Sequence, residues 1–438
     1  MEQMVTRVLN VGAWAEVELA PGKFAEARRA LTLQQKDSET VVAQYRNHKD
    51  NNRLYIPRAL VNSSGLAISG EWEKINVETS IKYRDGQKET IDTFMQALAQ
   101  RSPYGGILQA VTGAGKTVMA IDIIRRLGLK TLIVVPRTSL MAQWFNRVQE
   151  YSNLNGIADI GVVQGQTREY QNKSVVIAMI HTLAQQLENF PKEFYHAFGT
   201  VIFDECHTVG AETFSRTAPM FRCKYRVGLS ATPRRQDGMD KVFYWHLGPI
   251  TARFTKLQAN AKVRVIPYVG SDTDHVGCVW GGNLNLGRFL NRVAKSEGRL
   301  NLLTRIVATL DSKGHDILVL SDRIQHLRSL KFELMERGIS GDKIGMLIGN
   351  EKQLDKKIIL GTYGSAGMGV DIPRLTALVL ATPRADIEQA VGRVLRQGTP
   401  IIVDIVDVMS GIMLGWAGAR MKYYRKITND IQDRTRAA

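Results

Sequence analysis

Short apolar runs alternate with amphipathic stretches over most of the chain. Between residues 81 and 250 the runs have the length of buried strands, and the stretches between them carry apolar side chains at helical spacing. This alternation is typical of a parallel sheet covered by helices, so we expect an α/β domain over residues 81–250. The predicted strands are Thr131–Val135, Ser174–Ala178 and Thr200–Phe203, and the predicted helices are Gln87–Gln100 and Leu140–Tyr151.

The same alternation returns in the second half of the chain. After an irregular stretch with one strand-like run, Val263–Val269, the pattern resumes at Arg299. We therefore expect a second α/β domain over residues 251–410. Its predicted strands are Asp316–Leu320, Lys357–Gly361, Ala377–Ala381 and Pro400–Ile405, and its predicted helices are Leu300–Leu310 and Ile324–Arg337.

The two ends of the chain follow a different pattern. Residues 1–80 mix short β-like pieces with one helix, Lys23–Leu31, which predicts a small N-terminal α+β domain. This domain could bind nucleic acid or could only brace the first α/β domain. Residues 411–438 predict a helical tail rich in Lys and Arg. Its basic residues, with Tyr423 and Tyr424 among them, could grip phosphates and stack on bases, or could form a solvated helix covering the second domain.

Composition favours a polyanionic partner. The formal net charge is +16, from 58 Lys and Arg against 42 Asp and Glu, which suits nucleic acid, although a basic surface can also serve solubility alone. Cys206, Cys223 and Cys278 are scattered without zinc-ligand spacing and suit a reducing compartment. We see no membrane-spanning run and no secretory signal, and expect a cytoplasmic protein with no membrane partner and no obligate protein partner.

The segment from Ala110 to Thr117 reads AVTGAGKT and lies between a predicted strand and a predicted helix. Its glycines let backbone N–H groups converge on phosphate oxygens, and the helix N-terminus favours anions. Lys116 would reach the β- and γ-phosphates, and the Thr117 hydroxyl would ligate magnesium. The alternative is a glycine-rich turn with an exposed lysine. The loop residues expected to contact the nucleotide are Thr112, Gly113, Ala114, Gly115, Lys116 and Thr117.

Two carboxylates follow the predicted strand Thr200–Phe203, in the sequence DECH. In open α/β sheets, ligands bind at the carboxyl ends of the strands. Asp204 would hold magnesium, and Glu205 would orient and deprotonate the attacking water. A chance acidic strand end is the alternative, and the phosphate loop upstream argues against it.

A third motif, QAVGRVLR, begins at Gln389 in the second domain, which has no phosphate loop of its own. Arg393 and Arg396 are three residues apart, so a helix would present them on one face. Two guanidinium groups could neutralise charge that develops on a γ-phosphoryl group. A solvated helix face is the usual alternative for such a pair.

Together these segments resemble the superfamily 2 helicases, and within them the DEAD/DEAH-like motors of the XPB and UvsW type found in phage and bacterial DNA repair and recombination. The resemblance spans about residues 84 to 407. The similar segments are AVTGAGKT (motif I), Val135–Thr138 (Ia), Met179–Leu183 (Ic), DECH (II), Ser230–Thr232 (III), Leu320–Arg323 (IV), Gly361–Asp371 (V) and QAVGRVLR (VI). Gln87 resembles the glutamine that reads adenine, although Gly86 stands where an aromatic residue is usual.

The resemblance implies two RecA-like parallel-sheet domains in tandem, a P-loop NTPase fold that binds ATP and Mg²⁺. It implies catalytic roles for Lys116, Asp204, Glu205, Gln389, Arg393 and Arg396. It places Gln87, Gly369 and Asp371 with the loop residues around the nucleotide. It assigns nucleic-acid contacts to Arg137, Thr138, Thr182 and Thr362, and coupling of hydrolysis to strand contact to His207, Ser230 and Thr232.

The function predicted from these features is ATP-dependent unwinding or branch migration of forked or branched DNA in replication, recombination or repair. Three alternatives stay open. The chain could be an RNA helicase, because phosphate contacts ignore the base. It could be a translocase that moves on duplex DNA without separating the strands. It could also be a non-enzymatic nucleic-acid binding protein with a degenerate nucleotide site, although the intact Lys116, Glu205 and Arg396 argue against that.

Overall fold

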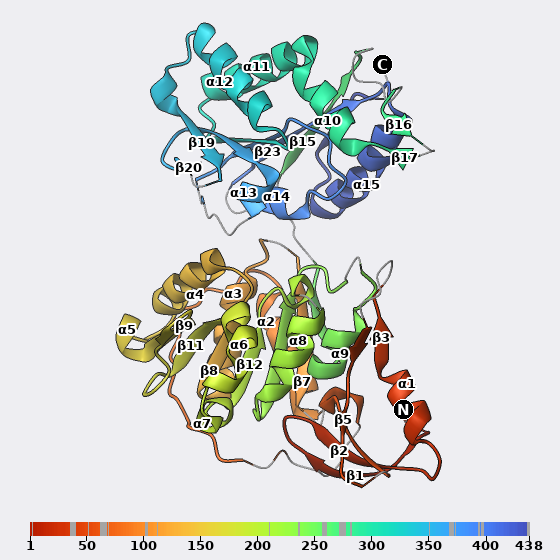
Figure 1. The fold of residues 1–438 in the computed structure, drawn as a ribbon. Helices are drawn as coiled ribbons and strands as arrows, with labels where there is room; N and C mark the ends of the chain where they lie inside the picture. The colour runs from red at the N-terminus through yellow and green to blue at the C-terminus, as the bar shows by residue number, and fades with distance from the viewer. Residues whose placement is uncertain are drawn as a thin grey trace. The chain divides into compact units, whose positions relative to one another are not determined.

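The computed structural model divides the chain into two compact units, one of residues 1–111 and 115–255 and the other of residues 112–114 and 256–438 (Figure 1). It describes the chain except residues 2, 36–40, 51, 62–67, 69, 101–103, 112, 210, 235–236, 256–260, 271–276, 281–282, 350, 368–371, 373, 393–394, 396–397 and 436–438. The side chains of residues 280, 283, 367 and 389 are likewise outside the description.

The first unit begins with a small antiparallel sheet, of strand order β1-β2-β6-β5, and the helix α1. Its elements are β1 (Val5–Val11), β2 (Ala15–Leu19), α1 (Phe24–Ala30), β3 (Thr32–Gln34), β4 (Val41–Ala43), β5 (Arg46–Asn47) and β6 (Arg53–Ile56). Alternate residues of β2 are buried, so one face of this sheet packs on its own apolar cluster.

A buried arginine fastens this N-terminal part to the large sheet of the same unit. Arg58 is 1% exposed, and its guanidinium donates to the carbonyls of Cys223 at 2.6 Å, Tyr104 at 3.2 Å and Lys224 at 3.3 Å. Burial, and then the charge of nearby Arg226, lowers the pKa of Arg58 to about 9. The N-terminal part is thus joined to the large sheet, and the nucleic-acid binding that the sequence left open for it stays a prediction.

The large sheet of the first unit has eight strands in the order β10-β9-β11-β8-β12-β13-β7-β14. Its neighbours pair in parallel except β10, which returns antiparallel to β9. Every residue of the central strands β8, β11 and β12 is buried, as expected for a parallel sheet covered on both faces. The strands are β7 (Gly105–Ala110), β8 (Thr131–Val135), β9 (Ile160–Gln164), β10 (Thr167–Arg168), β11 (Val175–Met179), β12 (Thr200–Phe203), β13 (Tyr225–Ser230) and β14 (Ile250–Phe254).

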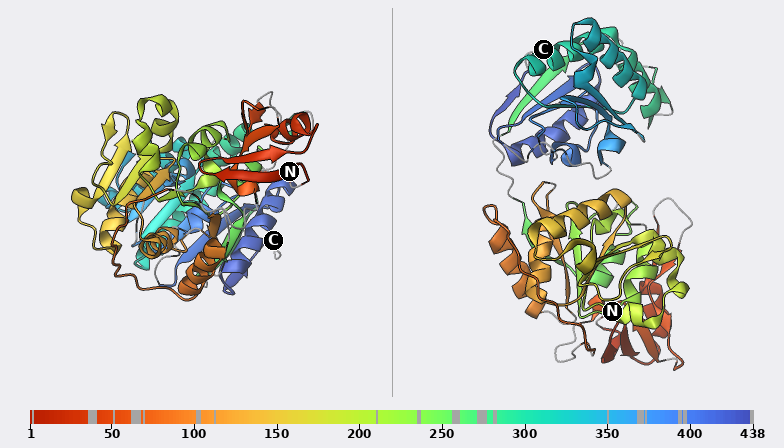
Figure 2. Two further views of the ribbon diagram at one scale, coloured as in Figure 1. Left: turned by 90° about the horizontal axis from the view of Figure 1, so that it is seen from below. Right: turned by 90° about the vertical axis from the view of Figure 1, so that its left-hand side faces the viewer.

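Helices cover both faces of this sheet (Figures 1 and 2). Helices α2, α3 and α4 neighbour one another on one face, and α6, α8 and α9 do so on the other. The helices are α2 (Gln87–Gln100), α3 (Lys116–Leu127), α4 (Thr138–Tyr151), α5 (Gly156–Asp159), α6 (Ile180–Gln185), α7 (Lys192–His196), α8 (Ala211–Thr217) and α9 (Lys241–Leu247).

The second unit repeats the strand order of the first. Its large sheet runs β20-β19-β21-β18-β22-β23-β15-β24, again parallel except for the first strand, β20, which returns antiparallel to β19. The strands are β15 (Lys262–Tyr268), β18 (Ile317–Ser321), β19 (Ile344–Ile348), β20 (Glu351–Lys352), β21 (Ile358–Thr362), β22 (Ala377–Leu380), β23 (Ile401–Asp407) and β24 (Ile431–Asp433). The prediction of two RecA-like parallel sheets in tandem is confirmed.

In both sheets, a glycine near the start of the neighbouring strand makes room for the chain that follows the short antiparallel edge strand. Gly161 is the second residue of β9, and a Cβ there would collide with the carbonyl oxygen of Glu169. Gly345 is the second residue of β19, and a Cβ there would collide with the carbonyl oxygen of Gln353. A glycine at this position lets the chain fold back closely over its own strand.

Helices of the second unit also form two layers, with α11 and α12 together on one face and α13, α14 and α15 on the other (Figure 1). A small hairpin, β16 (Val279–Trp280) with β17 (Asn283–Leu284), precedes the helix α10. The helices are α10 (Leu286–Lys295), α11 (Glu297–Ser312), α12 (Ile324–Glu336), α13 (Tyr363–Gly367), α14 (Glu388–Gly392) and α15 (Gly411–Ile427).

The C-terminal residues differ from the predicted basic helical tail. They form α15 and then β24, which pairs in parallel with β15 as the last strand of the sheet. Arg420 is buried and donates to Asp404 Oδ2 at 2.7 Å, and the Tyr424 hydroxyl donates to the same oxygen at 2.9 Å. Tyr423 is buried as well. These three side chains belong to the core, so the idea that they form a phosphate grip or base-stacking surface is wrong.

One strand crosses the domain boundary expected at residue 250. Strand β14 pairs in parallel with β7, so the first sheet continues to Phe254. Sequence alone did not separate this strand from the irregular stretch that follows, because an edge strand has only one neighbour and its residues are only partly buried.

Candidate functional site

The AVTGAGKT loop joins the end of β7 to the start of α3. Gly113 and Gly115 have φ angles of 82° and 80°, a left-handed conformation that side chains rarely adopt. Gly115 is the N-cap of α3, and the N–H groups of the first helical turn have no partner within the helix. Loop and helix end therefore offer donors and favourable potential to an anion, as the sequence predicted. Thr112 lies outside the described residues.

The predicted lysine and glutamate meet directly. Glu205 follows β12 in a left-handed conformation, with φ 45°, and Lys116 Nζ lies 2.8 Å from its Oε1. The two side chains are only 12% and 21% exposed, so the ion pair is partly shielded from solvent. Burial opposes the charge of Glu205, but Lys116 and then His207 outweigh it and lower the pKa of this carboxyl. Glu205 is thus ionised and next to the phosphate loop, as a base for water requires.

Asp204 is held by a tryptophan, Trp144, that was not among the residues predicted from the sequence. Trp144, on α4, is 1% exposed, and its indole Nε1 donates to Asp204 Oδ2 at 2.8 Å. The other oxygen, Oδ1, accepts the backbone N–H of Glu205 at 2.9 Å. Burial, and then the charge of Glu205, raises the pKa of Asp204 to about 6. The carboxylate is fixed in orientation at the strand end, which is what a metal ligand needs.

His207, the last residue of DECH, contacts the end of strand β13. His207 Nδ1 lies 2.8 Å from the Ser230 hydroxyl and 3.5 Å from Glu205 Oε2. Motifs II and III are therefore joined through one imidazole ring that also faces the candidate base. Thr232 is exposed on the turn after Ser230, where its carbonyl accepts the N–H of Arg234.

Gln87 lies at the start of α2 against the phosphate loop. It is 2% exposed, and its Oε1 accepts the backbone N–H of Arg84 at 2.7 Å. A Cβ at Gly115 would come within 2.7 Å of Gln87 Nε2. The structure thus brings Gln87 to the nucleotide loop, as the sequence predicted, and Gly115 has a second reason to lack a side chain.

The predicted nucleic-acid contacts of the first unit gather at the carboxyl edge of its sheet. Arg137 and Thr138 are exposed at the start of α4, after β8. Thr182, on α6 after β11, is buried, and its hydroxyl accepts the N–H of Gly165 at 3.0 Å. Gln164 Nε2 donates to the Thr138 hydroxyl at 3.2 Å, so the end of β9 links the two predicted positions.

The second unit has the same arrangement at the equivalent strand ends. Thr362 ends β21, and its hydroxyl donates to Ser365 Oγ at 2.9 Å. Ser365 Oγ in turn accepts the N–H of Gly349 at 3.2 Å, as Thr182 does from Gly165 in the first unit. Gly349 and Gly165 both follow the strand before the short antiparallel return. The sequence missed Ser365 and the two glycines, although a glycine just after an apolar run is a usable signal.

Five predicted site residues lie outside the described residues, namely Thr112, Gly369, Asp371, Arg393 and Arg396. The backbone of Gln389 is part of α14, and nothing is described of its side chain. The roles given to these residues stay predictions.

The residues around the phosphate loop fit a nucleotide with magnesium. Positive-φ glycines, a helix N-terminus and Lys116 suit phosphate, and the Thr117 hydroxyl and the Asp204 carboxylate are the hard oxygen ligands that Mg²⁺ prefers. Within the described part of the chain no three His, Cys, Asp or Glu residues are grouped as a metal site. Magnesium held here would therefore take further oxygens from water and phosphate.

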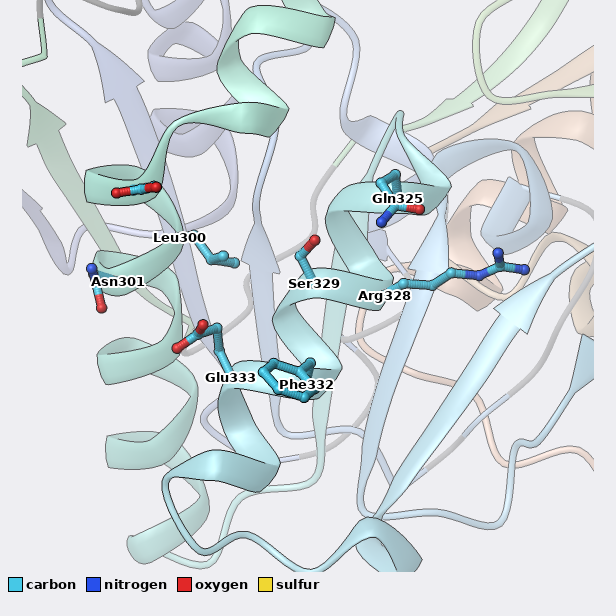
Figure 3. Close-up of a pocket in the computed structure, with 8 residues that line it drawn as sticks. Leu300, Asn301, Gln325, Arg328, Ser329, Phe332 and Glu333 are labelled. Carbon is cyan, nitrogen blue, oxygen red and sulfur yellow. The ribbon is translucent and has the colours of Figure 1, made fainter.

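A separate hollow of about 490 Å³ lies between α11 and α12 in the second unit (Figure 3). It contains none of the residues predicted from the sequence. Phe332, on α12, is 62% exposed at its border, and Glu333 points toward α11. The lining residues are Glu297, Leu300, Asn301, Gln325, Arg328, Ser329, Phe332 and Glu333.

Comparison with known proteins agrees with this geometry. Residues 80–235 match the family described as the res subunit of type III restriction enzymes. A protein of Acanthamoeba polyphaga mimivirus, provisionally named as an ATP-dependent RNA helicase, is 31% identical over 352 residues, which are 75% of this chain and 65% of that protein. The DNA 3'-5' translocase XPB2 of Sulfurisphaera tokodaii is 33% identical over 178 residues, 40% of this chain and 37% of that one.

Among solved structures, S. cerevisiae Dbp5 bound to RNA and ADP BeF3 is similar in fold, with a TM-score of 0.52 at 14% identity over 80% of this chain and 93% of Dbp5. Two tandem α/β units of one strand order, with a phosphate loop and a DECH strand end in the first, define a helicase-type P-loop NTPase. These likenesses support the resemblance of the chain to the superfamily 2 helicases. None of its described helices is long and apolar enough to cross a bilayer.

Proposed function

We propose that the chain is an ATP-dependent DNA helicase or translocase that acts on forked or branched DNA in replication, recombination or repair. The observation that carries the proposal is the arrangement around Lys116. A phosphate loop, an ionised glutamate 2.8 Å from the lysine and an oriented aspartate meet at one sheet edge. These are the groups that hydrolysis of a nucleoside triphosphate requires.

Binding of ATP begins at the loop. The N–H groups of the loop and of the first turn of α3 would bind the phosphates, and Lys116 would turn from Glu205 to the β- and γ-phosphates. Glu205, freed from the lysine, would take the proton of the attacking water. Thr117 and Asp204 would hold Mg²⁺, which neutralises phosphate charge when bound. Gln389, Arg393 and Arg396 would complete the site around the γ-phosphate, as the resemblance implies.

Coupling to nucleic acid would run through His207. Its ring faces both Glu205 and Ser230, so a change at the base can reach the end of β13. Arg137, Thr138, Thr182 and Thr362 would hold the phosphate backbone, since hydroxyls, guanidinium groups and backbone amides bind phosphate without reading sequence. Each nucleotide state must favour a different arrangement of the two domains for movement to follow.

RNA is the second candidate substrate. The mimivirus relative is provisionally named as an RNA helicase, whereas the shorter match is to a DNA translocase. The described site offers phosphate contacts at the strand ends, and such contacts serve DNA and RNA alike.

Parallel ATPase assays would separate these possibilities. Turnover is measured with single-stranded DNA, forked DNA, a four-way junction, duplex DNA and RNA at one salt concentration. Strand-displacement and triplex-displacement assays on the same substrates separate unwinding from translocation. The proposal expects the strongest stimulation by DNA forks or junctions. Stimulation by RNA alone would favour the second candidate, and absence of ATP hydrolysis with every substrate would refute both.

A further inference from the structure

Helix α10 carries a basic face that belongs to none of the helicase motifs. Its ten residues contain Arg288, Arg292 and Lys295 and no acidic residue. The three cations are four and three positions apart, so they project from one side of the helix. Arg288 and Lys295 are exposed, and within the described part of the chain neither side chain has an ion pair or hydrogen bond.

The opposite face of α10 is anchored in the second unit. Phe289, Leu290 and Val293 are buried with Cys278 and Met413, which fixes the rotation of the helix. The start of α10 is capped by Asn285, whose side chain accepts the N–H of Arg288 at 3.0 Å. With the apolar side fixed in this way, the basic side must face outward.

Motif IV holds α10 in place. Arg323, the N-cap of α12 after β18, donates through Nε to Asn291 Oδ1 at 2.6 Å and through a guanidinium N–H to the carbonyl of Gly287 at 3.0 Å. Arg323 and Arg137 occupy equivalent positions, each preceding the helix after the fourth strand of its sheet. Helix α10 therefore lies beside the carboxyl edge where the second unit also places Thr362.

The groove along the basic face suits an extended chain of phosphates. It measures about 370 Å³ and is lined by Arg288, Asn291, Arg292, Lys295 and Ser296. Among the described residues that line it there is no carboxylate; Glu297, the next residue, lines the neighbouring hollow. Asn291, which lines the groove, uses its Oδ1 to accept from Arg323, so its amide N–H groups remain as possible donors. From Arg288 to Lys295 the helix rises by about 10 Å, more than a single phosphate spans.

We propose that this α10 face (Arg288, Asn291, Arg292 and Lys295) binds the phosphate backbone of the nucleic acid on which the protein acts, outside the helicase motifs. The inference rests on the proposed function, since it takes nucleic acid as the partner. It adds a grip that carries no sequence information and that lengthens the stretch of backbone held by the second unit.

Salt dependence of binding tests the inference. Labelled single-stranded DNA, duplex DNA and RNA are titrated by fluorescence anisotropy at several salt concentrations, with the full-length protein and its Arg288→Gln/Lys295→Gln variant. Loss of two phosphate contacts should reduce the slope of log K against log salt by about 1.4 for single strands and about 1.8 for duplex. Affinity at about 0.1 M salt should fall by about 25-fold for single strands and about 60-fold for duplex, if affinity at about 1 M is unchanged. ATPase without nucleic acid and the melting temperature should stay unchanged.

A matched control removes the same charge elsewhere in the second unit. Lys313, before β18, and Lys422, on α15, are both exposed, so Lys313→Gln/Lys422→Gln should leave the slope as in the parent. An unchanged slope in the α10 variant, or an equal loss in the control, would overturn the inference while the proposed function stands. A parent protein that binds neither DNA nor RNA would remove the proposed function itself.

Discussion

Replacing Glu205 with Gln tests the candidate site most sharply, because this one change should move ATP binding and ATP hydrolysis in opposite directions. In the described state Lys116 Nζ lies 2.8 Å from Glu205 Oε1. ATP has to take the lysine away from this carboxylate before the lysine can bind phosphate. Glutamine keeps the size of the side chain and removes its charge, so the lysine is released in advance.

The size of the effect follows from burial of the pair. Exposed ion pairs contribute about 0.2–1 kcal/mol, whereas breaking a fully buried pair costs about 3–5 kcal/mol. At 12% and 21% exposure the Lys116–Glu205 pair lies between these cases. We expect removal of the competition to strengthen ATP binding by about 1.4 kcal/mol, which is about tenfold in Kd. Loss of the base should lower kcat by about 10²–10⁴-fold.

The assay compares this variant with Lys116→Ala, which removes the lysine of the same ion pair instead of the glutamate. Binding of a fluorescent ATP analogue and steady-state ATPase are measured for both proteins and the parent. Lys116→Ala should lose nucleotide affinity together with turnover, whereas Glu205→Gln should lose turnover alone. Nucleic-acid binding should survive largely in both.

Two results would contradict this reasoning. If Glu205→Gln hydrolyses ATP like the parent, Glu205 is not the base. If Glu205→Gln binds ATP more weakly than the parent, the ion pair does not compete with phosphate for Lys116, and the carboxylate instead helps to hold the lysine in place.

Three further predictions concern single side chains. Trp144→Phe removes the hydrogen bond to Asp204, and a hydrogen bond to a charged group contributes about 1.5–3 kcal/mol. The variant should therefore have about tenfold lower ATPase activity and need more magnesium for half-maximal activity. Magnesium titration of the ATPase checks this, and an unchanged titration would contradict it. Burial lowers the pKa of His326 to about 3, so as pH falls the unfolded chain takes up the proton first. The free energy of unfolding should therefore decrease below about pH 6.5, by about 2 kcal/mol at pH 5. Urea unfolding at pH 7 and pH 5 should show a smaller change in this free energy for His326→Gln than for the parent. Arg420→Met leaves Asp404 buried without its cation and should lower the free energy of unfolding by about 3–5 kcal/mol, and a double variant with Asp404→Asn should recover part of this loss.

Much of the fold could be predicted from the sequence because its strands are buried on both faces. Such strands appear as uninterrupted apolar runs, and β8 and β12 were placed residue for residue. The prediction did not name the buried strands β9, β13 and β19. It also missed β14 and β24, which have one neighbour each in their sheets. The side chains of β14 and β24 are only partly buried, so the apolar pattern weakens where the sheet ends.

Some residues of the candidate site could likewise be predicted from the sequence, and others could not. Lys116 and Glu205 could be predicted because the spacing of their motifs fixes what each can reach. Trp144 could not, since an apolar residue on an amphipathic helix gives no sign that its N–H meets a carboxylate 60 positions away. Arg420 was expected on the surface because it lies among other basic residues. Its partner, Asp404, is 16 positions away and is recognised only in the folded structure.

The short antiparallel strands β10 and β20, which fold back near Gly161 and Gly345, determine at which edge each large sheet could accept a further strand. Backbone amides along an unprotected margin would recruit strands from neighbouring molecules. Here β10 pairs with β9 and β20 pairs with β19 at that edge of each sheet. Gly161 and Gly345 let the chain after each short strand cross closely over β9 and β19, which keeps the short strand in place. Addition of a foreign strand is therefore restricted to the other side, along β14 in one half and β24 in the other.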